Sequence, residues 1–396
     1  MKKKLLCLSL ILVHILLVST VKAQKITLSE SGAISVLTMG PGTNLNDSFG
    51  HSAFRISDTN QNIDVVYNYG VYNFDTPNFY LKFVKGQLMY QLDRTDFSLF
   101  YQHYSDQDRW IKEQVLNLTL KEKQELFDFL QKNYLPENRK YIYDFFFENC
   151  ATRIRDVLAG VLKNKLVFDK NFVSKTHTFR QLIQKNVHWN SWGSFGMDLA
   201  IGAVVDRNAS SWEHQFLPEY IFKALEKGQI KRGLGATDLV KKTSILNKKL
   251  AKEKSETLLM SPFFIISLLA FIILGVTFKD YQNNSRSRWM DSGLYALTGI
   301  IGVFLILLWF ATDHFATQNN YNLLWAVPLS LFFVIEITKR NPKYWVKKYI
   351  MFQILMLLLM CIHWITGVQS YPVVLLPLLT ALGIRYIFIF NFLNKK

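Results

Sequence analysis

Hydrophobic residues concentrate at the two ends of the chain. At the N-terminus, the lysines at positions 2 to 4 precede an apolar run over residues 5–18, and Val21-Lys22-Ala23 follows as a small-residue cleavage site. This order of charge, apolar core and small residues predicts a secretory signal peptide over residues 1–23. An uncleaved anchor helix is the alternative. Either interpretation exports the segment that follows.

The C-terminal part of the chain, residues 258–396, contains long apolar stretches. There are five, at residues 258–278, 294–310, 323–337, 349–365 and 373–390. Stretches of this length predict a bundle of about five transmembrane helices, although the third is short for a full span. Helical spans indicate the inner (cytoplasmic) membrane, because an outer-membrane barrel would show alternating strands of about ten residues.

Lysine and arginine residues alternate between the loops of this bundle. They lie between the first and second stretches, between the third and fourth, and at the C-terminus, whereas residues 311–322 and 366–372 contain none. The positive-inside rule therefore places the preceding globular domain outside, in the periplasm, on a multi-pass membrane protein.

The net charge of +16 lies largely beside the hydrophobic segments. This distribution favours anionic lipid headgroups as the partner and argues against nucleic acid. Six lysines between residues 241 and 254 precede the first span on its outer side. We interpret residues 226–257 as a basic linker that either contacts anionic lipid or is simply solvated.

The exported segment, residues 24–225, predicts an α+β domain. Residues 34–38, 51–56 and 65–69 read as strands, the last of them ended by Gly70. Residues 120–133 and 151–162 have apolar positions at helical spacing, and Asn149 is a suitable N-cap for the second helix.

One cysteine stands alone in this domain, because Cys7 lies in the signal and Cys361 in an apolar stretch. Cys150 is therefore a free thiol, and its place in the first turn of a helix favours the thiolate and an oxyanion site. His51, at the start of a strand, is the candidate base. A cysteine at a helix start facing a histidine on a sheet is the papain arrangement, here in permuted order. An inert buried cysteine is the alternative.

Further candidates surround this pair. Asn68 and Tyr69 are candidates to orient His51, and Asn68 is preferred because its amide oxygen can accept from an imidazole N–H; a turn-capping role is the alternative. Asn149 is a candidate oxyanion donor or a plain N-cap. Arg153 is a candidate ligand for a lipid phosphate.

The pair Asp313 and His314, in a predicted outer loop, is a candidate headgroup site, with ordinary interfacial capping as the alternative. We predict no metal and no cofactor.

Three runs carry a resemblance to a known family: residues 48–56, residues 67–70 and residues 145–156. Together they resemble the Lnb family of lipoprotein N-acyltransferases from the Bacteroides group, and residues 216–220 and 312–322 extend the likeness over nearly the whole chain. The order of histidine and Asn-Cys is also similar to permuted papain-like enzymes such as lecithin retinol acyltransferase, a likeness of fold only.

The resemblance implies an acyltransferase that works through a thioester on Cys150, with His51 as base. A phospholipid is the implied acyl donor, and the α-amine of a diacylglyceryl-cysteine lipoprotein the acceptor. Two alternatives stay open on the residues alone. One is an envelope cysteine hydrolase, a peptidase or amidase; the other is a non-catalytic membrane scaffold, in which Cys150 would be buried away from His51.

Overall fold

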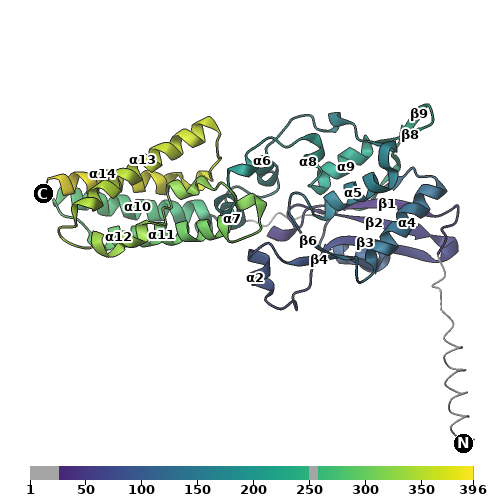
Figure 1. Cartoon of the computed structure of the whole chain (residues 1–396), viewed down its shortest axis with the longest axis horizontal. Coiled ribbons are helices and arrows are strands. Elements are labelled where there is room, and N and C mark those ends of the chain that lie inside the picture. Colours follow the sequence, from purple (N-terminus) through teal and green to yellow (C-terminus); the bar gives the residue numbers. More distant parts are fainter. Residues whose placement is uncertain (1–25, 249–256, 396) are drawn as a thin grey trace, which may run out of the picture.

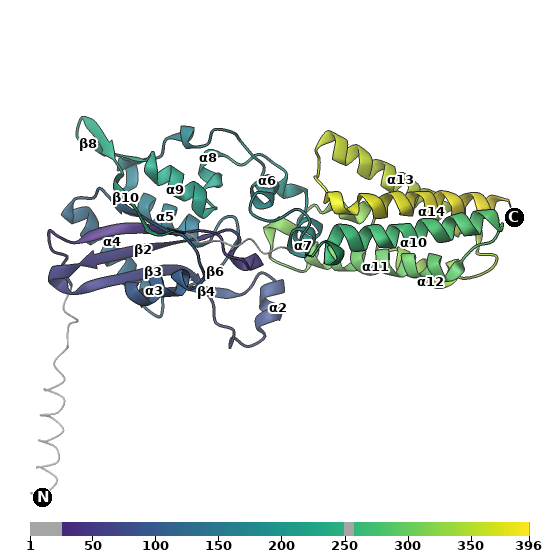
Figure 2. The same cartoon turned by 180° about the vertical axis from the view of Figure 1, so that it is seen from behind.

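The computed structural model describes residues 26–248 and 257–395, so the predicted signal peptide lies outside the described residues. An N-terminal α+β domain is followed by a C-terminal helical bundle, as expected (Figures 1 and 2). The two parts lie end to end, and the C-terminus marks the end of the bundle that is remote from the α+β domain.

The α+β domain is built on a seven-stranded antiparallel sheet in the order β10-β5-β1-β2-β3-β4-β6, and a small sheet in the order β7-β8-β9 accompanies it. The strands are β1 (Ala33–Met39), β2 (His51–Asp58), β3 (Ile63–Val71), β4 (Met89–Asp96), β5 (Ile111–Leu116), β6 (Lys140–Ile142), β7 (Leu166–Val167), β8 (Gln229–Arg232), β9 (Gly235–Asp238) and β10 (Val240–Asn247).

The helices of this domain are α2 (Phe79–Val84), α3 (Phe97–Ser105), α4 (Leu120–Tyr134), α5 (Cys150–Leu162), α6 (Phe179–Gln184), α7 (Trp192–Ala200), α8 (Ser211–His214) and α9 (Pro218–Glu226). The predicted helices at residues 120–133 and 151–162 correspond to α4 and α5. Thr119 begins α4 with a capping box, and Asn149 begins α5 in the same way.

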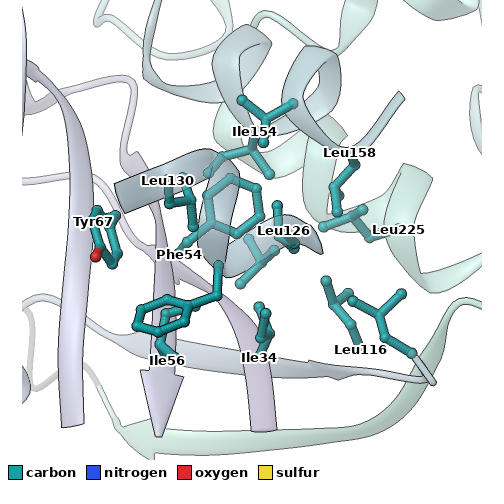
Figure 3. Close-up of a cluster of buried hydrophobic side chains, with 14 of the residues drawn as sticks. Ile34, Phe54, Ile56, Tyr67, Leu116, Leu126, Leu130, Ile154, Leu158 and Leu225 are labelled. Carbon is teal, nitrogen blue, oxygen red and sulfur yellow. The ribbon is translucent and has the colours of Figure 1, made fainter. Parts of the chain in front are cut away.

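Alternation along the strands sorts the core onto the two faces of the sheet. One face packs against α4, α5 and α9, where Phe54 of β2 meets Leu126, Ile154 and Leu225 (Figure 3). The opposite face carries α3 and a smaller cluster around Phe100. The start of α5 and the start of β2 can therefore meet at one end of this packed layer, where the candidate active site lies.

Two predicted boundaries in this region are wrong. The strand at residues 65–69 does not end at Gly70, because β3 continues to Val71 through a register shift after Asn68. Residues 226–257 are not simply a linker, because β8, β9 and β10 occupy much of this range and β10 pairs with β5. β10 is an edge strand, and lysines are common on edge strands because they prevent further pairing.

In the part of the bundle that the structure describes, four helical segments are long and apolar enough to cross a membrane. They are α10 (Pro262–Gln282), α11 (Arg288–Phe310), α13 (Tyr344–Thr366) and the segment Val373–Asn394, which includes α14 (Leu376–Asn394). The third predicted stretch is different. It forms the 3-10 turn η8 (Tyr321–Leu324) and, after an irregular segment, the eight-residue helix α12 (Ser330–Ile337).

The irregular segment between η8 and α12, together with the first turn of α12, packs closely against two glycines of α11. A Cβ on Gly302 would lie 2.2 Å from the Ala326 carbonyl oxygen, and one on Gly299 would lie 2.7 Å from Leu331 Cγ. Non-helical backbone is tolerated at membrane depth only where protein buries it, and this close approach provides such cover. Hydropathy alone predicted a helix here because it does not distinguish a buried irregular segment from a span.

The irregular segment and α12 connect the end of the bundle that contacts the α+β domain with the opposite end. Arg286, between α10 and α11, donates to the carbonyls of Ile337 and Lys339 at 2.9 and 2.6 Å. At the opposite end, Asn320 donates to the carbonyls of Leu199 and Ala200 at 2.8 and 3.0 Å. The lysine-free loop after α11 therefore contacts the α+β domain, in agreement with the sidedness predicted from the charges.

Candidate active site

Cys150 is the first residue of α5, and Asn149 holds it there. The Asn149 side-chain oxygen accepts from the N–H groups of Ala151 and Thr152, each at 2.9 Å. Its amide nitrogen donates to the carbonyls of Phe145 and Phe216 at 2.6 and 2.8 Å. Because both amide N–H groups are used, Asn149 acts in this arrangement as the predicted N-cap and has no donor left for an oxyanion.

His51 begins β2, and Asn68 lies beside it on β3. His51 donates from Nε2 to the Asn68 side-chain oxygen over 2.5 Å. Tyr69, the other residue considered for this role, points to the opposite face of the sheet, where its hydroxyl donates to Asn133 at 2.5 Å. The two-residue period of a strand thus separates these candidates: it turns Asn68 toward His51 and Tyr69 into the core.

The thiol of Cys150 and the imidazole of His51 are hydrogen-bond partners. Burial opposes the thiolate, but the charge of His51, its hydrogen bond and the backbone N–H groups of Ser52 and Ala151 favour it, so the pKa of Cys150 lies below its ordinary value. Burial likewise opposes the imidazolium, yet Cys150 and Asn68 raise the pKa of His51 above its ordinary value. Both shifts favour a thiolate–imidazolium pair.

Gly70 lies close to the side chains of both Cys150 and His51. Its φ of +92° lies in a region that L side chains rarely adopt. A Cβ at this position would lie 3.7 Å from Cys150 Cβ and 3.8 Å from His51 Cε1. Gly70 therefore lets β3 pass close to the pair, a role that its sequence position at an apparent strand end did not reveal.

Two further residues of the site were missed by the sequence analysis. Tyr104 of α3 stacks on the His51 ring, with ring centroids 6.2 Å apart. Arg109 is 3% exposed, lies over the Tyr104 ring at 4.6 Å and donates to the Gly40 carbonyl at 2.7 Å. The positive charge of Arg109 favours the Cys150 thiolate and lowers the pKa of His51. No local pattern marks these residues, because only the packing of α3 under the sheet brings them to His51.

The two arginines after Cys150 have carboxylate partners. Arg153 forms an ion pair with Glu148 and lies over the Tyr141 ring at 4.4 Å. Arg155 forms an ion pair with Asp156 at 2.7 Å. Neither pairing provides a direct observation of a phosphate site, and the role of Arg153 as a lipid ligand stays a prediction.

Asp313 and His314 contact the segment around α2 rather than the side chains of the thiol–imidazole pair. Asp313 accepts from the Gln87 side chain at 2.8 Å, and its own N–H donates to the Lys85 carbonyl at 2.8 Å. His314 donates from Nε2 to the Phe83 carbonyl at 3.0 Å. These contacts attach the outer loop to the α+β domain, and a headgroup role for the pair stays a prediction.

The catalytic candidates lie close to the membrane bundle. Phe147, three residues before Cys150, packs edge to face on Phe315 of the outer loop, with centroids 5.3 Å apart. Cys150 itself is 7% exposed and borders the main core. No group of three histidine, cysteine or acidic side chains in the described ranges 26–248 and 257–395 is placed to hold a metal ion.

Comparison with protein families gives two matches that together cover most of the chain. Residues 20–185 match the Lnb N-terminal periplasmic domain, and residues 252–396 match the Lnb transmembrane domain. Comparisons with curated proteins and with solved structures gave no match. Because both halves match in the order found here, the chain belongs to the Lnb family of membrane-bound lipoprotein-processing proteins.

Proposed function

We propose that this protein is a lipoprotein N-acyltransferase of the inner membrane that moves an acyl chain from a phospholipid, through a thioester on Cys150, to the α-amine of a diacylglyceryl-cysteine lipoprotein. The observation that carries the proposal is the chain of contacts from the Cys150 thiol to His51 and from His51 to Asn68. A thiol, a base and a group that orients the base are the parts that cysteine acyl transfer requires.

In the first half-reaction, the Cys150 thiolate attacks the ester carbonyl of the phospholipid. The carbon–oxygen bond to the glycerol breaks, and the His51 imidazolium gives its proton to the leaving alkoxide. The products are a lysophospholipid and an acyl thioester. His51 Nε2 is bound to Asn68, which leaves Nδ1 as the ring nitrogen that exchanges the proton.

The start of α5 supplies the stabilisation that the tetrahedral intermediate needs. In the described first turn, the N–H groups of Ala151 and Thr152 bind the Asn149 side chain, and that of Arg153 binds the Asn149 carbonyl. The N–H of Cys150 itself is then the donor best placed for the oxyanion, with the positive end of the helix behind it.

In the second half-reaction, the lipoprotein amine attacks the thioester, and neutral His51 accepts a proton from the amine. The carbon–sulfur bond breaks, an amide forms, and the Cys150 thiolate returns paired with the imidazolium. An amide is more stable than an ester, so the overall transfer needs no nucleotide. Both substrates are membrane lipids, which suits a domain whose thiol lies next to the outer loop of a membrane bundle.

The two alternative functions, a non-catalytic scaffold and a cysteine hydrolase, predict different geometries for the site. A scaffold would keep Cys150 away from His51, and the hydrogen bond between them speaks against that expectation. A hydrolase of soluble peptides would use the same pair, but its substrates give no reason for docking the site onto a membrane bundle. These contacts support the transferase over both.

The test is to express the wild type and Cys150→Ala in a strain depleted of its own lipoprotein N-acyltransferase. Intact mass spectra of the N-terminal lipopeptide of a reporter lipoprotein give the readout. We expect the wild type to add one acyl mass and Cys150→Ala to add none. Acylation by both would exclude Cys150 as the nucleophile. Acylation by neither, with membrane insertion verified, would favour the hydrolase.

A further inference from the structure

Large apolar side chains are exposed on and beside α2, a short helix in the loop between β3 and β4. Tyr80 is 77% exposed, Leu81 54% and Phe83 51%, and Phe74 just before the helix is 63% exposed. A contiguous exposed apolar surface of this kind on a folded domain marks a contact with a membrane or another protein. We call residues 74–84 the lip.

The lip is attached where a membrane span ends. Asp313 and His314 follow α11 by three and four residues, and they make three hydrogen bonds to Phe83, Lys85 and Gln87. The end of α11 is itself apolar and open, with Phe310 71% exposed. In both whole-chain views α2 lies at the bundle-facing end of the α+β domain (Figures 1 and 2). The exposed surface of the lip therefore lies at the depth at which α11 leaves the bilayer.

The composition of the lip fits the lipid–water interface. Aromatic rings with a polar end, such as Tyr80, are preferred at headgroup level. Lys82 lies in the lip and Lys85 directly follows it, and their long side chains can reach anionic headgroups while their stems stay among apolar atoms. A soluble protein partner would not require this combination of an interfacial aromatic ring, lysines that can reach headgroups and a position at the end of a membrane span.

A row of aromatic rings leads from the lip toward Cys150. Phe79 of α2 packs on Tyr72 with centroids 5.7 Å apart, Tyr72 on Tyr90 at 5.2 Å, and Tyr90 stacks on Tyr143 at 4.3 Å. Gly70 then joins the row to the site, because a Cβ there would lie 3.7 Å from both Tyr143 and Cys150.

Tyr72, Tyr90 and Tyr143 are half-buried, so each ring is only partly covered. The row can therefore offer an apolar surface along which an acyl chain can lie.

We propose that the lip inserts into the outward-facing leaflet of the bilayer that holds the bundle, and that a phospholipid leaves the leaflet along the aromatic row to bring its ester to Cys150. This inference deepens the proposed function and rests on it for the delivery step. The membrane contact of the lip depends on geometry alone and can be tested apart from acyl transfer.

The first experiment measures insertion in the full chain with its native cysteines replaced. A bimane label is placed by Leu81→Cys in the lip or by Leu99→Cys on α3, a matched control that is 60% exposed on the same domain. The protein is reconstituted into nanodiscs that contain phospholipids brominated along the acyl chain. We expect quenching at position 81 and none at position 99. Equal quenching at the two positions would refute insertion of the lip into the bilayer.

The second experiment measures delivery. The triple variant Tyr80→Ser/Leu81→Ser/Phe83→Ser is compared with the control Leu99→Ser/Phe129→Ser/Leu234→Ser, whose side chains are also exposed and lie away from the lip. Lysophospholipid release from a bilayer donor should fall about tenfold further in the lip variant, since it loses interfacial binding. An equal fall in both variants would overturn the delivery path. Quenching at position 81 of the labelled chain, together with a wild type that transfers no acyl chain, would refute the proposed function but would still support insertion of the lip.

Discussion

The hydrogen bond from His51 to Asn68 predicts a specific pH effect on catalysis. Asn68→Ala removes the acceptor at 2.5 Å from Nε2, and this acceptor is one of the groups that raise the pKa of His51. The imidazolium exists below that pKa, and in the proposed mechanism it is the form that protonates the leaving group. Losing the acceptor lowers the pKa, so we expect the alkaline limb of the rate profile to move to lower pH.

The size of the rate effect follows from the kind of hydrogen bond. A bond to a charged group contributes about 1.5–3 kcal/mol. At about 1.36 kcal/mol for each factor of ten, kcat/KM in Asn68→Ala should fall about 10- to 150-fold. Asn68→Asp offers a carboxylate in the same place, which favours the imidazolium more strongly. We therefore expect this variant to move the alkaline limb the other way, to higher pH.

The assay is lysophospholipid release by the full chain in nanodiscs, measured across the pH range for each variant. Tyr69→Phe is the matched control, because it removes a hydrogen bond from the neighbouring residue on the opposite face of β3. Its pH profile should match that of the wild type. An unmoved alkaline limb in Asn68→Ala, or the same displacement in Tyr69→Phe, would refute the assignment of Asn68 as the group that orients His51.

Two other variants test how the site is held. Asn149→Ala removes a helix cap and leaves two buried carbonyls without donors, so we expect a loss of about 2–4 kcal/mol in unfolding free energy. Thermal unfolding in detergent measures it, and an unchanged Tm would contradict the cap. Gly70→Ala forces a side chain into a left-handed conformation at a cost of about 1–2 kcal/mol beside the thiol. The rate of Cys150 alkylation in Gly70→Ala, measured as a function of pH, should show a smaller thiolate fraction than in the wild type. An unchanged profile would contradict the close approach of β3 to Cys150.

Features set by local chemistry were predictable from the sequence. A short strand-like run predicted β1, alternation predicted β2, and an asparagine before a helical stripe predicted the start of α5. The same local rules placed Cys150 on the first turn and allowed Asn68 to be preferred over Tyr69. The sequence therefore predicted that these groups would meet, while their catalytic roles stay predictions.

Features set by tertiary packing were not predictable in this way. Arg109 and Tyr104 reach His51 only because α3 covers the second face of the sheet. The lysines of β10 resemble those of a solvated linker, and its pairing with β5 depends on a strand more than a hundred residues earlier. The segment before α12 is apolar, but Pro328 interrupts a helix there because proline lacks a backbone N–H, and the close contact with Gly302 then buries the irregular backbone.

Direct contacts fix the site relative to the bundle. Phe147, in the turn that Asn149 fastens, packs on Phe315, and the N–H of Gly202 donates to the Ala316 carbonyl at 2.8 Å. A Cβ on Gly202 would lie 1.9 Å from the Gln318 carbonyl oxygen, so this junction leaves no room for a larger residue.

In the proposed mechanism, a thiol held this way stays at one depth relative to the outer loop in both half-reactions. Because the proposed donor ester and the proposed acceptor amine are both anchored by acyl chains, we expect them to come to nearly the same depth in the leaflet. Exchange of lysophospholipid for lipoprotein then requires only lateral movement of the lipids, with no reorientation of the domain.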